Sequence, residues 1–228
     1  MRAFVYIRQL CALSMNLGMK NSVPEPTLRR LPWYLSYAKM QLQQGQKVLS
    51  STQIAYGVGV DASVVAKDLS AVSLTGRTRV GYELDELSRY LEEFLGFRFS
   101  HKAFLFGVGS LGGALIQDRG LQQFGLDIVA GFDKKYELSG TSINHIPIHH
   151  LSRFAELQQK LHVEIGVLCV PVEAAQQVAQ QMIDEGIKAI WNFTPMRIHV
   201  PENVVVQNTS LYAHLALMYD RMKIEDKD

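Results

Sequence analysis

Residues 104–112 read Phe-Leu-Phe-Gly-Val-Gly-Ser-Leu-Gly, a short apolar run followed at once by a Gly-x-Gly-x-x-Gly motif. The apolar run predicts a buried strand, and Ala114-Leu115-Ile116 after the motif predicts a helix. A second apolar run, 128–132, ends in Asp133, which lies 26 residues after Gly107. A lone glycine motif is weak evidence. Strand, glycines, helix, second strand and terminal acid together predict the βαβ unit of a dinucleotide-binding fold.

The residues of this motif have distinct physical roles in such a fold. Gly107 permits the tight turn, Gly109 lets the backbone approach a pyrophosphate, and Gly112 allows close packing of helix on strand. The helix N-terminus favours an anion, and Asp133 is expected to accept hydrogen bonds from the adenosine ribose. An acid there also repels a 2′-phosphate, which favours NAD over NADP, although the lysines at 134–135 weaken that preference. The alternative is a glycine-rich turn without a ligand.

Two later apolar runs, 163–169 and 189–193, predict further strands of the same open sheet, and the periodicity of 172–186 predicts a helix between them. Pro171 and Pro195 follow these strands, at the carboxyl ends where such sheets bind ligands. The predicted cofactor-binding residues are Gly107, Val108, Gly109, Ser110, Leu111, Gly112, Asp133 and Pro171.

The first third of the chain predicts a separate helical module. Apolar residues recur at three- and four-residue steps from Leu28 to Leu42, which predicts an amphipathic helix ending near Gly45. Two shorter helices are expected at 52–56, capped by Ser50 or Ser51, and at 62–72, capped by Asp61. Because a Gly57-Val58-Gly59 turn joins them, the pair is typical of a helix-turn-helix.

Residues 74–84, Leu-Thr-Gly-Arg-Thr-Arg-Val-Gly-Tyr-Glu-Leu, predict a basic β-ribbon that turns at Gly76, and a further helix runs on to Gly96. This order of elements predicts a winged helix, whose second helix enters the major groove while the ribbon contacts phosphate or the minor groove. The predicted DNA-contacting residues are Ser51, Ser63, Lys67, Arg77 and Arg79. A winged helix used for protein contacts is the alternative.

The charge of the chain is unevenly distributed. The 228 residues carry a formal net charge of +1, but residues 1–82 hold ten Lys or Arg against three acids, and residues 83–228 hold thirteen against nineteen. A net of +7 on the first segment favours a basic module that meets a polyanion, with an uneven solvated surface as the alternative. The 47% hydrophobic content excludes disordered, collagen-like and coiled-coil classes.

Cysteine and histidine usage excludes other classes. Cys11 and Cys169 lie far apart without a paired motif, which excludes a disulfide framework or zinc site and favours the cytoplasm. The histidines at 145, 149 and 150 have no Cys or carboxylate at ligand spacing, so no metal site is predicted.

The sequence predicts neither a membrane span nor a signal peptide. No apolar run approaches the roughly 18 residues of a membrane span, so no membrane partner is expected. Residues 1–22 lack a clean signal-peptide core and are expected to be an extension without a role, with Met15 or Met19 as the true first residue.

With these motifs in this order, the chain resembles the Rex redox-sensing transcriptional repressors. The stretches that carry the resemblance are VPEPTLRRLPWYL, SST, KDLS, VGY, GVGSLG, GFD, VPVEAAQ, GIKAIWNFTP and VPENVVVQN, in order over residues 23–215. The resemblance implies an α/β homodimer with a winged helix at 23–99, a Rossmann domain with a doubly wound parallel sheet at 100–208, and a C-terminal dimerisation helix within 209–228. That helix, at 211–222, would be swapped into the partner. It further implies that NADH releases the dimer from a palindromic double-stranded operator, whereas NAD+ permits DNA binding.

The chain departs from the family pattern at functional positions. Ala66-Lys67 stands where family members usually have an Arg-Lys pair, and Arg79 stands where glycine is usual. Three positions that couple ligand to domain movement through Arg, Tyr and Asp are Ser36, Asp118 and Ser210 in this chain. None keeps the charge or phenol that its role needs, so a salt-bridge switch of that type cannot operate.

The predicted function is therefore a non-enzymatic DNA-binding repressor that senses the NADH/NAD+ ratio. A diverged NAD-binding dimer with weakened or lost DNA binding is the alternative that Ala66 and the altered wing favour. A third hypothesis is a small NAD-dependent dehydrogenase. Its candidate proton carriers, His145, His149, His150 and Lys188, form no recognisable catalytic constellation.

Overall fold

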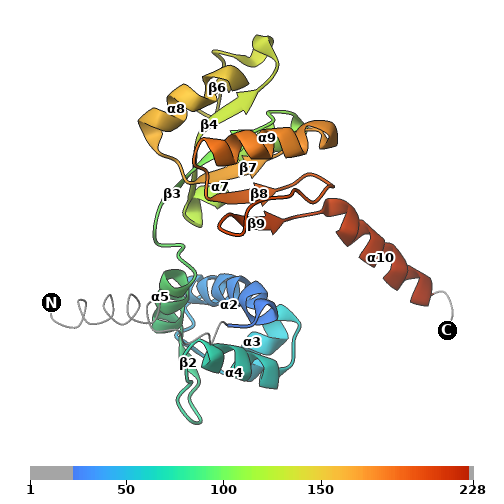
Figure 1. Ribbon diagram of the computed structural model, residues 1–228. Coiled ribbons are helices and arrows are strands. Elements are labelled where there is room, and N and C mark those ends of the chain that lie inside the picture. Colours follow the sequence, from blue (N-terminus) through green and yellow to red (C-terminus); the bar gives the residue numbers. More distant parts are fainter. Residues whose placement is uncertain (1–22, 226–228) are drawn as a thin grey trace. The chain divides into compact units, whose positions relative to one another are not determined.

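The computed structural model describes residues 23–225, and its contacts divide the chain into two compact units. Unit 1 ends at Leu95 and unit 2 begins at Gly96, a few residues before the boundary expected after residue 99 (Figure 1). The predicted extension 1–22, with Cys11 and its alternative start residues, lies outside the described residues.

Unit 1 is helical with one small antiparallel sheet. Its elements are α2 (Glu25–Gln43), β1 (Val48–Leu49), α3 (Ser51–Val58), α4 (Ala62–Ala71), β2 (Tyr82–Glu83) and α5 (Leu84–Phe94). Leu31, Leu35 and Ala38 of α2 are fully buried, at the four- and three-residue spacing that places them on one helix face. Pro32 lies inside α2 without ending it.

The helix-turn-helix pair α3–α4 forms at the predicted N-caps, although α3 continues to Val58 and so includes most of the predicted glycine turn. Ser50, not Ser51, caps α3: the backbone N–H of Gln53 donates to Ser50 Oγ (3.2 Å), and the Ser50 N–H donates to Gln53 Oε1 (2.8 Å). These two bonds form a capping box, in which each residue satisfies a backbone donor of the other. Asp61 does stand at the N-cap of α4, but the expected side-chain cap bond is absent. That part of the prediction was wrong.

The wing also differs from the predicted ribbon. The turn lies at residues 78–80, closed by a bridge between Arg77 and Gly81, and not at Gly76. The strand that follows it, β2, pairs with β1 of the preceding segment, in the register Leu49↔Tyr82. The ribbon was mispredicted because its strand partner lies more than thirty residues earlier in the chain, outside any local pattern.

Unit 2 is an α/β layer structure. Its elements are β3 (His101–Phe106), α6 (Ser110–Gln117), α7 (Arg119–Gln123), β4 (Leu126–Asp133), η1 (Tyr136–Leu138), β5 (Ser142–Ile143), β6 (Ile146–His150), η2 (Leu151–Arg153), α8 (Phe154–Leu161), β7 (Ile165–Leu168), α9 (Val172–Asp184), β8 (Ala189–Asn192), β9 (Val205–Asn208) and α10 (Leu211–Glu225).

The sheet of unit 2 confirms the predicted doubly wound α/β class. Its strand order is β5-β6-β4-β3-β7-β8-β9, and every pair from β6 to β9 is parallel. The strands that follow β3 in the chain first lie on one side of it (β4, then β6) and later on the other (β7, β8 and β9). The point between β3 and β7 is the topological switch point, where such sheets bind ligands. The antiparallel edge strand β5 was not predicted, because a two-residue strand leaves no periodic pattern.

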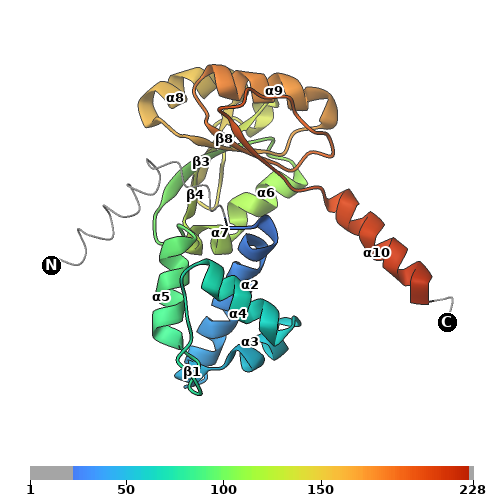
Figure 2. The same cartoon turned by 60° about the horizontal axis from the view of Figure 1, so that its bottom comes forward.

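Alternation along β3 builds a core on both faces of this sheet. Phe104 and Phe106 point to the face covered by α8 and α9, where their rings pack against Phe154. Ala103 and Leu105 point to the face covered by α6. Figure 2 shows these helices on opposite sides of the strands. Both faces are buried, which explains why the strand reads as a continuous apolar run.

Candidate functional site

The glycine turn after β3 has the geometry that its sequence predicts. Gly107 has φ +93°, and a Cβ there would lie 2.6 Å from the carbonyl oxygen of Cys169. A Cβ at Gly112 would lie 2.0 Å from the carbonyl oxygen of Gly107, so only glycine allows α6 to begin so close to the strand. By contrast, nothing lies within 4 Å of the Cβ position of Gly109. The turn is therefore tightly packed on its inner side and open at its middle glycine.

Asp133 closes one side of this turn. Its Oδ2 accepts a hydrogen bond from the backbone N–H of Val108 (2.8 Å), and its Oδ1 accepts one from the N–H of Lys135 (2.9 Å). Each carboxylate oxygen has a second lone pair available for a ribose hydroxyl. Sequence spacing identified Asp133, but its hydrogen bond to Val108 forms because β4 pairs with β3.

The end of β7 completes this edge of the sheet. Cys169 packs its carbonyl against Gly107, and two residues later Pro171 forms the N-cap of α9. The predicted residues of the glycine turn, Asp133 and the segment leading to Pro171 are thus neighbours at one carboxyl edge. Burial raises the pKa of the Cys169 thiol to about 12, so it is a neutral group at pH 7 and no thiolate nucleophile lies there.

Asn192 organises the neighbouring loop at the end of β8. Its Oδ1 accepts hydrogen bonds from the N–H (3.0 Å) and the hydroxyl (2.8 Å) of Thr194, while its Nδ2 donates to the carbonyl of Met196 and to Asn208 Oδ1, both at 2.8 Å. The side chain is fully buried and fully bonded. Asn192 therefore shapes the loop and fixes β9.

The predicted recognition helix α4 presents a polar face to solvent. Ser63 and Lys67 lie four residues apart on this exposed face, and Ala66 beside them is exposed as well. Ser51 is the first residue of α3 and is half-buried. No cation on α4 other than Lys67 is available for a phosphate or base contact.

A buried charged cluster, which sequence reasoning missed, holds α4 on α2. Asp68, 2% exposed, accepts hydrogen bonds from Thr27 (2.8 Å), Tyr34 (2.7 Å) and both Nε (2.6 Å) and Nη2 (2.8 Å) of Arg30. Burial acts to raise the pKa of Asp68, but these donors outweigh it and hold that pKa below its usual value. Burial and the Asp68 carboxylate raise the pKa of Tyr34. Since Asp68 follows Lys67 directly, the cluster fixes the part of the α4 backbone from which the exposed lysine projects.

The wing turn projects from the end of unit 1 beside α4 (Figure 1). Arg79 lies in this turn with φ +65°, a left-handed conformation that glycine adopts more readily than any other residue. Arg77, in contrast, forms a 2.8 Å ion pair with Glu83.

Ion pairing reduces the number of cations that unit 1 can offer to a polyanion. Residues 23–82 contain seven Lys or Arg. Four of them form ion pairs: Arg29 with Glu25, Arg30 with Asp68, Lys39 with Glu92, and Arg77 with Glu83. Lys47, Lys67 and Arg79 have no ion pair within residues 23–225.

Two of the three positions at which the resemblance implied ligand coupling serve as local helix caps in this chain. Asp118 caps α7 by accepting from the N–H of Gly120 (2.8 Å), and Ser210 Oγ accepts from the N–H of Ala213 (3.2 Å) at the start of α10. Ser36 is exposed on α2.

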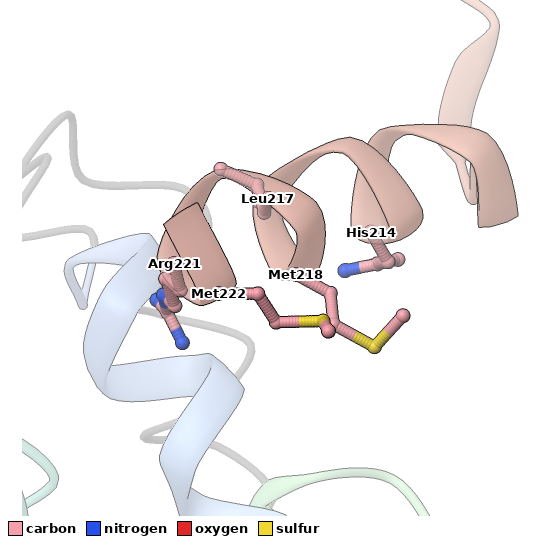
Figure 3. Close-up of a pocket in the computed structure, with 5 residues that line it drawn as sticks. All are labelled: His214, Leu217, Met218, Arg221 and Met222. Carbon is pink, nitrogen blue, oxygen red and sulfur yellow. The ribbon is translucent and has the colours of Figure 1, made fainter. Parts of the chain in front are cut away.

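Helix α10 carries large apolar side chains that the single chain leaves exposed. They are Leu211, Tyr212, Leu215, Leu217, Met218, Tyr219 and Met222. Figure 3 shows His214, Met218 and Met222 projecting from one side of the helix, where they line a hollow together with Leu217 and Arg221. These residues are spread over more than half of the circumference of α10, a wide apolar surface of the kind that a helix buries against another element.

The histidine segment forms strand β6. Burial, and then the nearby Arg153, lower the pKa of His149, whose ring lies 6.0 Å from that of Phe132. Within the described part of the chain, no three His, Cys, Asp or Glu side chains are grouped to hold a metal ion. Among the described helices, none has both the length and the apolar character needed to cross a membrane.

Comparison with known proteins agrees with this division of the chain. A family model described as "Putative DNA-binding protein N-terminus" matches residues 22–70, and one described as "CoA binding domain" matches residues 100–196. The redox-sensing transcriptional repressor Rex of Bacteroides thetaiotaomicron is 60% identical to this chain, over 90% of this chain and 93% of the relative. Rex of Porphyromonas gingivalis is 61% identical, over 90% and 94%.

Solved structures extend the comparison to three dimensions. The crystal structure of RSP, a Rex-family repressor, in complex with β-NAD+ and operator DNA matches with a TM-score of 0.84 at 30% identity, covering 91% of this chain and 95% of that one. The RSP complex with β-NADH matches with a TM-score of 0.81 at 30% identity, over 91% and 97%. By sequence identity over nearly its whole described length, and by fold, this chain belongs to the Rex family of redox-sensing transcriptional repressors.

Proposed function

We propose that this chain is a homodimeric repressor that binds operator DNA through unit 1 and senses the NADH/NAD+ ratio through unit 2. The observation that carries the proposal is the bond from the Val108 N–H to Asp133, which places a ribose-binding carboxylate at an open glycine turn. Relatives 60% and 61% identical are redox-sensing repressors, and the similar RSP structures hold NAD+ with operator DNA, or NADH.

The cofactor is NAD, as NADH or NAD+, bound by the residues of the glycine turn, Asp133 and Pro171. The backbone N–H groups at the start of α6 face the pyrophosphate, and the helix dipole favours its charge. Asp133 accepts from the ribose hydroxyls and repels a 2′-phosphate. Pro171 lies at the nicotinamide end, where a difference in affinity between the two redox forms is needed to shift a two-state dimer.

Operator binding is assigned to α4 and the wing. Ser63 and Lys67 enter the major groove on α4, Ser51 contacts the backbone at the start of α3, and the wing turn meets phosphate or the minor groove. Arg79 has no ion pair among the described residues and contacts DNA directly, whereas Arg77 must leave Glu83 to do so.

The homodimer is assigned to α10. An apolar helix that a single chain leaves exposed finds burial in a second copy, and a two-fold dimer matches a palindromic operator. Because Ser36, Asp118 and Ser210 stand at the coupling positions that the resemblance implies, we infer that the movement between DNA-bound and released states has another basis in this chain.

No enzymatic activity is proposed. Cys169 is a neutral buried thiol, and no acid–base pair is assigned at the nicotinamide end. A repressor acts where its operator DNA lies, so we assign this chain to the cytoplasm.

A diverged regulator with weak DNA binding is the second candidate. The observations that favour it are the exposed Ala66 on α4 and the ion pair that occupies Arg77. Each removes one cation from a predicted interface whose affinity depends on phosphate neutralisation.

A gel shift with the gene's own upstream DNA tests the proposal and separates the two candidates. The wild-type chain is expected to shift a palindromic fragment, NADH to abolish the shift, and NAD+ to leave it. Lys67→Ala is expected to weaken binding and to lower the salt slope by about one, because one phosphate or base contact is lost. The matched control is Lys160→Ala, on α8 of unit 2, which should bind like wild type.

Two other outcomes of the gel shift would each contradict a different part of the proposal. Absence of any shift, together with tight NADH binding in calorimetry, supports the diverged regulator. A shift that responds equally to NADH and NAD+ contradicts redox sensing.

A further inference from the structure

Beside the dinucleotide site lies an aromatic pair for which the motifs have no role. The rings of Tyr136 in η1 and His150 at the end of β6 stack with centroids 3.8 Å apart and planes 12° apart. Tyr136 is 72% exposed, so burial does not explain its position. One face of the phenol ring is covered by the imidazole.

The sheet places this pair directly beyond Asp133. In the parallel pairing of β4 with β6, Asp133 is the register partner of His150. Tyr136 follows Asp133 by three residues, and the bond from the Lys135 N–H to Asp133 Oδ1 holds the intervening backbone against the carboxylate. Across β3, β4 and β6, the edge therefore presents the glycine turn, then the acid, then the aromatic pair.

This order matches the covalent order of a dinucleotide. A pyrophosphate at the glycine turn leads to the ribose, whose hydroxyls reach Asp133, and the ribose leads to its adenine base. The base therefore lies on the side of the ribose away from the turn, which is the side of Tyr136 and His150.

Hydrogen bonds fix the orientation and the tautomer of His150. The Ser152 N–H donates to its Nδ1 (3.3 Å), which is also 2.8 Å from Ser152 Oγ. Nδ1 is then an acceptor, so the neutral ring carries its proton on Nε2. The imidazole is therefore held in one orientation, in which it supports the phenol ring as a flat stacking surface.

We infer that Tyr136 and His150 form the adenine-contacting wall of the dinucleotide site, with the base stacked on the aromatic pair. The inference rests on the proposed function, which supplies the dinucleotide. Tyr136 binds a flat base in this arrangement and does not distinguish the redox forms, because adenine is identical in NADH and NAD+.

Calorimetry on the full-length chain tests the inference with three ligands: NADH, NAD+ and ADP-ribose. Tyr136→Ala is expected to weaken all three by the same factor, on the order of tenfold or more, as base–aromatic stacking does. Tyr136→Phe should retain wild-type affinity, because the ring remains. Tyr56→Ala, at an exposed tyrosine of α3 in unit 1, is the matched control and should change nothing.

The outcomes separate this inference from the function on which it rests. If the wild-type chain binds NADH and ADP-ribose but Tyr136→Ala binds them equally well, the adenine wall is wrong and the dinucleotide site stands. A loss that differs between NADH and NAD+, or that ADP-ribose does not show, also overturns it. If the wild-type chain binds none of the three ligands, the proposed function itself fails.

Discussion

Asp68 is the single side chain on which the position of the predicted recognition helix most depends. It is a carboxylate 2% exposed that receives four hydrogen bonds, two of them from one guanidinium. A buried carboxylate is costly unless it is paired and bonded, and here its partners come from α2, about 34 to 41 residues earlier in the chain. The same contacts tie the backbone at Lys67 to the core of unit 1.

Replacing Asp68 by Asn should destabilise unit 1 by about 2–4 kcal/mol at pH 7, because Arg30 loses its charge partner. The pKa of Asp68 is lowered in the folded chain, so its carboxylate stabilises the fold above the ordinary carboxyl pKa, and this contribution is lost as pH falls through the folded pKa. The deficit of Asp68→Asn should therefore shrink at acid pH. Urea unfolding, followed by circular dichroism at several pH values between 7 and 3, measures the difference in unfolding free energy between the wild type and this variant.

Asp61→Asn is the matched control for this prediction. Asp61 stands at the N-cap of the same helix without a side-chain cap bond, so its loss should change the unfolding free energy by less than about 0.5 kcal/mol. Equal effects of the two substitutions would contradict the role given to the Asp68 cluster.

At the scale of elements, the wing is where this chain combines backbone strain with charge. Arg79 holds a left-handed φ of +65° in a three-residue turn closed by Arg77 and Gly81. A non-glycine residue in that conformation costs about 1 kcal/mol relative to glycine. Its guanidinium is exposed and has no ion pair within residues 23–225. The wing therefore presents an exposed cation, but its turn is strained because that cation is carried by a residue with a left-handed backbone conformation.

Arg79→Gly should consequently have opposite effects on stability and on binding. We expect the variant to be more stable by about 0.5–1 kcal/mol, since the strain is removed. Its affinity for operator DNA should fall, and the salt slope should decrease by about one. Thermal unfolding and gel shifts at several salt concentrations measure the two effects.

Arg77→Gly provides the comparison, because Arg77 has no positive φ. It should weaken DNA binding without any gain in stability. An Arg79→Gly variant that binds DNA with unchanged affinity and salt slope would remove Arg79 from the interface.

For the whole molecule, the decisive features are the distribution of charge and the exposed helix α10. Residues 1–82 carry a formal net charge of +7, but not every cation in that sum is available to DNA. Within residues 23–82, four of the seven cations form ion pairs. Two copies of unit 1 on one duplex double the remaining free cations. We propose that burial of the apolar side chains of α10 between two copies drives that assembly.

Leu217→Asp should therefore convert the dimer into a monomer. Leu217 is 56% exposed in the single chain, so a charge there is tolerated by the monomer fold but is costly in an apolar interface. Light scattering after size-exclusion chromatography measures the mass, and operator binding should fall with it. Tyr56→Asp, 91% exposed on α3, should remain dimeric. A Leu217→Asp dimer with unchanged mass would exclude α10 as the contact.

Local sequence determined the βαβ unit, its glycine turn, Asp133 and the helix-turn-helix pair, because periodicity, capping and left-handed turns depend on residues within a few positions of one another. Only the tertiary structure decided the rest. It showed that β2 pairs with β1, that Asp133 bonds Val108, that Asp68 gathers Thr27, Arg30 and Tyr34, and that Tyr136 stacks on His150. Most of these contacts join residues far apart in the chain, and their partners are selected by the packing of whole helices and strands, which leaves no pattern in the local sequence.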